Sequence, residues 1–266
     1  MTVKLIIAPP AAGKTAACID RILAIHKEQP LAQVWVIVPD RQKAPYFRQR
    51  LAEAGGGMGV HIGTFRDLYV EILENNGIFT PVVTPALDNR LVQETVDAAL
   101  TANQLVHYGN IAHKPGFILV LQDAFAELRG AYVTPEAFLD YTLTSSPTRV
   151  ELAILYDRYI ARLKDLNWID LEGQSCLAAE VLRNNPQAVK GIDYVVVDGF
   201  TSFSGVRREF LRLLSSQIEE MIITLPGEQD SSRMVYRKSN LVIKELKDSL
   251  QVQEQYPVLE SHLPKF

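Results

Sequence analysis

Short, wholly apolar runs alternate along this chain with segments in which apolar residues recur every three or four positions. Such runs are typical of strands buried on both faces of a parallel sheet, and such periodicity is typical of amphipathic helices. The apolar runs cover residues 4–7, 33–38, 60–62, 194–197 and 221–225, with a further short strand expected near residue 252. The pattern predicts an α/β fold built on a parallel sheet.

The middle of the chain departs from this alternation. Between residues 81 and 186 no strand-like run of comparable strength occurs, and helices are expected at about 86–102, 115–130, 135–143, 148–166 and 170–184. We therefore expect a split α/β domain made of residues 1–80 and 187–256, with residues 81–186 inserted as a helical domain. Residues 257–266 would then be a tail or the start of a further region.

Composition and charge narrow the class of protein. No apolar run approaches the length of a membrane span, and residues 1–4 lead into a strand instead of a cleavable signal segment. We therefore expect no membrane association and a cytoplasmic location. The two cysteines, Cys18 and Cys176, lack metal-ligand spacing, which favours reduced thiols.

The net charge of −4 excludes the uniformly positive surface of an autonomous DNA-binding protein. Any contact with nucleic acid has to be local. Basic residues cluster only at 41–50 and 207–212, and the solvated face of a helix is the commoner explanation of such clusters.

The most specific chemistry lies in residues 4–18, KLIIAPPAAGKTAAC, which predict a strand, a tight loop and a helix. Backbone N–H groups at the start of such a helix bind phosphate, Lys14 is placed to reach the β- and γ-phosphates, and the Thr15 hydroxyl is placed to ligate Mg²⁺. The candidate nucleotide-binding residues are Ala11, Ala12, Gly13, Lys14 and Thr15. Because Ala8 replaces the first glycine of the usual pattern, a chance match is the alternative.

Asp198 strengthens this interpretation, because it ends an apolar strand late in the same α/β unit. Nucleotide triphosphatases use such a carboxylate to hold Mg²⁺ opposite the loop, although a simple strand-end turn residue is the alternative. Gly199 follows it, where motor ATPases commonly carry a glutamate that orients the attacking water. We therefore expect ATP binding with Mg²⁺ and weak or absent hydrolysis, unless Glu228, Gln229 or Asp230 reaches the phosphates.

Several segments resemble the first RecA-like domain of superfamily 1 helicases and, within that group, the AddB (also RexB-like) subunit of bacterial helicase-nucleases. The loop fits an AxxGxGKT variant through Ala8, with Ala11 at the place of its middle glycine. VPDRQKAPYFRQRL resembles a VP-x-x-Q segment that contains Gln42, and VVVDGFTSFSGVRREFLRLL resembles the DGF-x-x-F segment of the AddB family. IGTFRDL resembles a helicase segment whose threonine and aromatic residue face single-stranded DNA.

The resemblance implies a RecA-like P-loop sheet with a large all-helical insertion, similar to helicase domains 1A and 1B. It implies that Gln42 contributes to the nucleotide site and that Thr64 and Phe65 contact single-stranded DNA, with a separate motor subunit as partner. Helix capping by Thr64 and core packing by Phe65 are the structural alternatives. It also implies that the nuclease domain with its iron–sulfur cluster is not part of these residues, since two cysteines cannot hold such a cluster.

Two other classes of function stay open on the residues alone. One is a small-molecule phosphotransferase, with the helical block as a lid over the nucleotide. The other is a structural scaffold whose loop is vestigial. The effect of single-stranded DNA on nucleotide affinity, and the effect of replacing Lys14, separate these alternatives.

Overall fold

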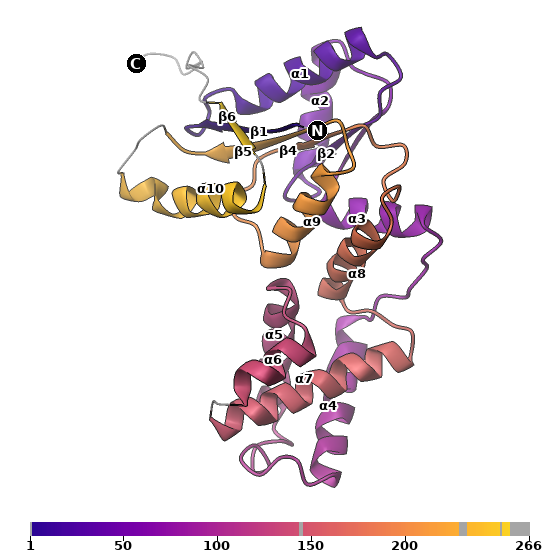
Figure 1. The fold of residues 1–266 in the computed structure, drawn as a ribbon, viewed down its shortest axis with the longest axis vertical. Coiled ribbons are helices and arrows are strands. Elements are labelled where there is room, and N and C mark those ends of the chain that lie inside the picture. Colours follow the sequence, from indigo (N-terminus) through magenta and orange to yellow (C-terminus); the bar gives the residue numbers. More distant parts are fainter. Residues whose placement is uncertain (1, 144–145, 229–232, 251, 256–266) are drawn as a thin grey trace. The chain divides into compact units, whose positions relative to one another are not determined.

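The computed structural model describes residues 2–143, 146–228, 233–250 and 252–255. They divide into two compact units, which can be followed by the sequence colours of Figure 1. The sheet unit comprises the residues up to 76, residues 178–203 and the residues from 207 onward. The helical unit comprises residues 77–177 and 204–206.

The sheet unit is built on one six-stranded sheet with the strand order β3-β2-β4-β5-β1-β6. Its strands are β1 (Thr2–Ala8), β2 (Val34–Ile37), β3 (Val60–Gly63), β4 (Tyr194–Val197), β5 (Glu220–Pro226) and β6 (Val252–Gln255). Every described pairing is parallel, so the predicted α/β fold with a parallel sheet is confirmed. The carboxyl ends of β1, β5 and β4 lie next to one another at a single edge of this sheet.

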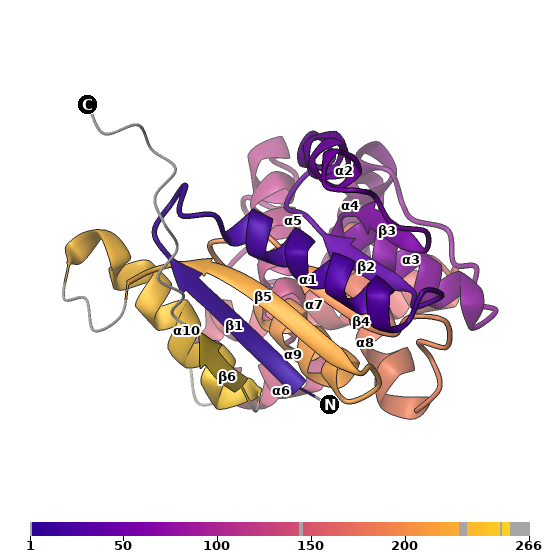
Figure 2. The same ribbon diagram turned by 90° about the horizontal axis from the view of Figure 1, so that it is seen from above.

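Helices cover both faces of the sheet, as the wholly apolar strands require. Figure 2 shows α1 and α2 on one face and α9 and α10 on the other. The helices of this unit include α1 (Lys14–Glu28), α2 (Lys43–Glu53), α3 (Phe65–Asn75), all but the first two residues of α9 (Gly205–Ser215), and α10 (Arg237–Ser249), together with the short 3-10 helix η1 (Met234–Tyr236). Ile22 of α1 and Phe47 of α2 pack with Val34 and Val36 of β2 in one buried cluster, which anchors both helices on the sheet.

The helical unit contains α4 (Pro85–Thr101), α5 (Pro115–Gly130), α6 (Pro135–Thr142), α7 (Pro147–Asp165) and the first half of α8 (Leu171–Asn184). Each of the first four begins with a proline, which has no N–H to leave unpaired and is preset for the first helical turn. Phe125, Tyr156 and Tyr159 are almost fully buried and form the aromatic centre of its core.

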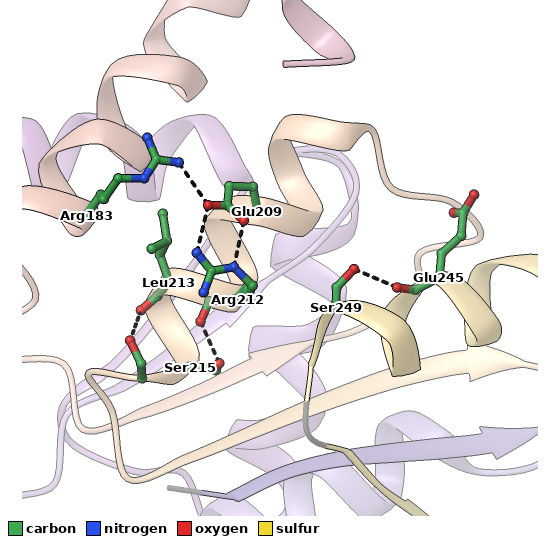
Figure 3. Close-up of polar contacts among 8 residues, drawn as sticks. Arg183, Glu209, Arg212, Leu213, Ser215, Glu245 and Ser249 are labelled. Atoms are coloured by element: carbon green, nitrogen blue, oxygen red, sulfur yellow. Dashed lines mark hydrogen bonds and ion pairs between the residues drawn. The ribbon is translucent and has the colours of Figure 1, made fainter. Parts of the chain in front are cut away.

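Polar contacts tie the second half of α8 to α9 (Figure 3). The carboxylate of Glu209 accepts hydrogen bonds from Arg183 at 2.9 Å and from Nε of Arg212 at 2.7 Å. The hydroxyls of Ser215 and Ser249 each donate to a backbone carbonyl one turn earlier, at 2.8 Å and 2.7 Å. Arg212 is therefore part of an intramolecular ion pair.

Other expectations about organisation stay predictions. They are the RecA-like assignment and the identity of residues 81–186 as an inserted domain. The expected tail at 257–266 lies outside the described residues, and so do Gln229 and Asp230. None of the helices that the structure describes combines the length and apolar character needed to cross a membrane.

Candidate nucleotide-binding site

The loop between β1 and α1 has the backbone shape of a glycine-rich turn although it contains one glycine. Gly13, the residue before α1, has a φ of 84°, and Ala11 has a φ of 60°. Both values lie in the left-handed region, which costs a residue with a Cβ atom about 1–2 kcal/mol. Ala11 thus adopts the conformation that the middle glycine would favour, and the loop closes through a hydrogen bond from Ala12 N to Pro9 O of 3.3 Å.

Lys14 folds back over this loop. Its ammonium donates to the carbonyl oxygens of Ala8 at 2.8 Å and of Pro9 at 2.7 Å. Burial lowers the pKa of Lys14, and the negative charge of Asp198 partly offsets this effect. Because both hydrogen-bond acceptors are uncharged, the positive charge stays available to an anion in the loop.

The loop and the end of β4 meet through one short hydrogen bond. Thr15 Oγ1 donates to Asp198 Oδ2 at 2.8 Å, although the two residues lie far apart in the sequence. The other carboxylate oxygen, Oδ1, accepts from the hydroxyl of Thr224 at 2.7 Å, and Gly199 N donates to that same hydroxyl at 3.1 Å. Two residues that the sequence singled out for Mg²⁺, Thr15 and Asp198, are therefore in direct contact.

This donor set fits a magnesium ion. Mg²⁺ prefers oxygen ligands and is commonly held by one or two protein oxygens, with phosphates and water completing its octahedron. Among the described residues, no group of three or more histidine, cysteine, aspartate or glutamate side chains is placed to hold a metal. A metal bound here would therefore depend on a nucleotide for most of its ligands.

Thr224 is a member of this site that the sequence analysis did not single out. It lies on β5, the strand between β1 and β4, and is fully buried. The available signal was a hydroxyl within the apolar run MIITL, since a buried hydroxyl needs a hydrogen-bond partner. That partner becomes known only once the strand order is known.

The other residues expected to bind nucleotide, to assist hydrolysis or to contact DNA make their described contacts with residues outside this cluster. The carboxylate of Glu228 lies 3.5 Å from the guanidinium of Arg233. Gln42 is exposed at the start of α2. Thr64 caps α3 in a reciprocal capping box with Asp67. No described hydrogen bond or ion pair joins Gln42, Thr64 or Glu228 to the phosphate loop.

Phe65 belongs to the core of the sheet unit. It is 3% exposed and packs edge-on against Phe200 and Phe210, with ring centroids 5.2 and 6.3 Å away. The guanidinium of Arg207 lies 5.4 Å from its ring centroid. The ring is therefore not open to a nucleic-acid base in this conformation, and a role in DNA contact stays a prediction.

A family model and three known relatives all indicate the same protein family for this chain. A family model described as "ADDB, N-terminal" matches residues 5–263. The chain is 28% identical over 243 residues to the B subunit of an ATP-dependent helicase/deoxyribonuclease of Moorella thermoacetica, covering 85% of this chain and 20% of that protein. Proteins of the same name from Carboxydothermus hydrogenoformans and Alkaliphilus oremlandii are 24% and 21% identical, over 95% and 96% of this chain. The chain thus spans between 20% and 24% of the length of these relatives.

Proposed function

This chain belongs to the AddB N-terminal family, and we propose that it is the ATP-binding, helicase-like part of the B subunit of a helicase/deoxyribonuclease in DNA repair and recombination. The observation that carries the proposal is the 2.8 Å hydrogen bond between Thr15 and Asp198 beside the ammonium of Lys14. It brings the two residues proposed to hold Mg²⁺ into contact, although they lie far apart in the sequence. The names of the relatives, which include the words ATP-dependent, support the same conclusion.

Each residue has a definite part in binding. The backbone N–H groups from Ala11 to Thr15 and the ammonium of Lys14 bind the phosphates at the positive end of α1. Thr15 and Asp198 hold Mg²⁺, which neutralises charge on the phosphate oxygens when it is bound. Thr224 holds the Asp198 carboxylate in orientation through its second oxygen.

Gly199, the residue after Asp198, favours ATP binding without efficient hydrolysis. Gly199 has no side chain to orient a water molecule, and its φ of 83° is a conformation that residues with side chains rarely adopt. The backbone at this position is therefore shaped for glycine. We propose weak or absent hydrolysis by this chain.

The remaining parts of the proposal rest on the family resemblance. The sheet unit is a RecA-like P-loop domain, residues 81–186 are its helical insertion, and Gln42 adds to the nucleotide site. Single-stranded DNA is contacted near Thr64, where the half-buried Arg207 supplies positive charge over the core residue Phe65 and the exposed Arg66 supplies a second charge. A motor subunit supplies translocation, and the complex acts in the cytoplasm.

Nucleotide binding and hydrolysis by the full chain, with and without single-stranded DNA, test this function. We expect saturable binding of MgATP, little phosphate release, and a change of nucleotide affinity on addition of an oligonucleotide. Transfer of phosphate to a small molecule, with affinity indifferent to DNA, would favour the phosphotransferase. Absence of any nucleotide binding would favour a scaffold and contradict the proposal.

A further inference from the structure

The first turn of α2 lies beside the end of β4. β2 pairs with β4 in parallel register, with Ile37 opposite Val197, and Asp198 N donates to Ile37 O at 2.9 Å. The chain then turns at Asp40, whose carboxylate accepts from the backbone N–H groups of Gln42 and Lys43 at 3.0 Å each. This short connection brings the start of α2 back over the carboxyl edge of the sheet.

Lys43 projects from this turn towards Gly199. A Cβ atom built on Gly199 would lie 3.9 Å from Nζ of Lys43 and 3.7 Å from Cδ of Pro39. The missing side chain of Gly199 therefore leaves a space that an ammonium group borders. Motor ATPases commonly carry at this position a glutamate that orients the water attacking the terminal phosphate, so the surroundings of Gly199 would adjoin that phosphate in a nucleotide bound as proposed.

Lys43 is exposed, and within the described residues its ammonium makes no ion pair. The neighbouring Arg41 is different, because its guanidinium donates to Asp67 at 2.7 Å. The backbone N–H of Lys43 is capped by Asp40, so that only the side chain is available for a ligand.

We infer that Lys43 binds the terminal phosphate of the nucleotide and makes the site select triphosphates over diphosphates, an inference that rests on the proposed nucleotide site. A cation replaces the carboxylate that a motor would use at this place. The two groups act differently on a nucleotide, because an ammonium attracts the γ-phosphate and, unlike a carboxylate, does not accept a proton from water. A site of this kind detects ATP and retains it.

Lys43 and Lys14 then contact different phosphates of the nucleotide. Lys14 contacts phosphates shared by ATP and ADP, so replacing it weakens the binding of both nucleotides. Lys43 contacts the phosphate that ADP lacks, so replacing it weakens the binding of ATP alone. A charge-assisted hydrogen bond of ordinary strength corresponds to a change of about tenfold in affinity.

The test is titration calorimetry of the full chain with Mg·ATPγS and with Mg·ADP. Lys43→Gln is expected to weaken ATPγS binding about tenfold and to leave ADP binding unchanged. Lys43→Arg keeps the charge and should restore part of the preference for ATPγS. Lys27→Gln, at an exposed lysine in the last turn of α1, is the matched control and should bind both nucleotides like the parent chain.

Four results would overturn the inference. Unchanged ATPγS affinity in Lys43→Gln, or an equal loss for both nucleotides, removes the selective role of Lys43 but not the proposed nucleotide site. A loss of single-stranded oligonucleotide binding without any nucleotide effect assigns Lys43 to DNA. A parent chain that binds neither nucleotide refutes the proposed function itself, which distinguishes that failure from the other three.

Discussion

Two buried aspartates, one in each unit, show how similar burial leads to different chemistry. Asp198 and Asp170 are both 8% exposed. Asp198 accepts from two uncharged hydroxyls, and the nearby ammonium of Lys14 bonds to backbone carbonyls, so no described ion pair neutralises this carboxylate. Asp170 lies 2.9 Å from Nε of Arg129 and accepts from Gly173 N at 2.8 Å, so its charge is neutralised within the fold. The first arrangement is open to a cation, and the second is a structural ion pair.

Glu151 repeats the closed arrangement in the helical unit. One of its oxygens accepts from the backbone N–H groups of Val106 and His107 at 2.9 and 2.8 Å, and the other accepts from Tyr108 N at 3.0 Å. Nδ1 of His107 lies 2.8 Å from the same carboxylate. A buried carboxylate therefore indicates a binding site only where its oxygens are not occupied by backbone N–H groups or by a cation of the fold.

The largest effect on the free energy of unfolding is expected from removing Arg129, the partner of Asp170. Arg129→Met leaves Asp170 buried without its cation and should destabilise the helical unit by about 3–5 kcal/mol. Burial already raises the pKa of Asp170, and Arg129 opposes that rise. The chain has two tryptophans, Trp35 in the sheet unit and Trp168 in the helical unit, so urea unfolding followed by fluorescence in a Trp35→Phe background reports on the helical unit alone.

The matched control for this experiment is Arg90→Met. Arg90 forms an exposed ion pair with Glu94 on α4, with its side chain 77% exposed. Exposed pairs of this type contribute about 0.3–0.5 kcal/mol. Equal effects of the two substitutions would contradict the distinction between a closed buried pair and a surface pair.

The next effect is expected at the open carboxylate. Asp198→Asn retains the shape and one acceptor oxygen but removes the charge that would hold Mg²⁺. We expect the affinity for MgATP to fall by about 1.5–3 kcal/mol, which is about ten- to a hundredfold. Fluorescence titration of the chain with ATP, once in Mg²⁺ and once in EDTA, measures this affinity. A variant that binds as tightly as the parent in Mg²⁺ would show that Asp198 is only a structural residue.

A smaller effect, dependent on pH, is expected at Glu151. Burial raises the pKa of this carboxyl, but hydrogen bonds from the backbone of His107 and Tyr108 outweigh burial and the net pKa is lowered. A lowered folded-state pKa contributes stability that is present above the unfolded value of about 4.3 and is lost as pH falls through the folded value. Glu151→Gln should therefore destabilise the helical unit by about 1–2 kcal/mol at pH 7.

The pH dependence provides the decisive readout. The difference in unfolding free energy between parent and Glu151→Gln, measured in the same tryptophan background, should stay constant near neutral pH and shrink below about pH 4. A difference that is independent of pH down to about pH 2 would show that the carboxylate charge does not matter there.

The smallest effect is expected in the phosphate loop itself. Ala11→Gly removes the cost of a left-handed alanine and should stabilise the sheet unit by about 0.5–1 kcal/mol, since part of the gain is offset by the freedom of glycine in the unfolded chain. Ala12→Gly, at a neighbouring residue without a positive φ, is the control and should be neutral or destabilising. Unfolding followed by Trp35 in a Trp168→Phe background measures both. A destabilised Ala11→Gly would mean that the loop does not adopt this shape.

The sequence was sufficient for the parts of the fold that depend on local pattern. The alternation of apolar runs and helical periodicity predicted the strands and helices, because burial on two faces and burial on one face leave different patterns. The contacts that complete the candidate site depend on strand order, which is not local. Thr224 reaches Asp198 only because β5 lies between β1 and β4, and Lys43 reaches Gly199 only because β2 lies next to β4. The left-handed backbone of Ala11 could not be predicted either, because a residue with a Cβ atom rarely adopts it.

Nucleotide binding by the phosphate loop is tested most directly by MgATP titrations of the parent chain, Lys14→Ala and Lys27→Ala. We expect saturable, Mg²⁺-dependent binding in the parent chain and in Lys27→Ala, and its loss in Lys14→Ala. Equal binding in all three proteins, or binding in none of them, would contradict the account.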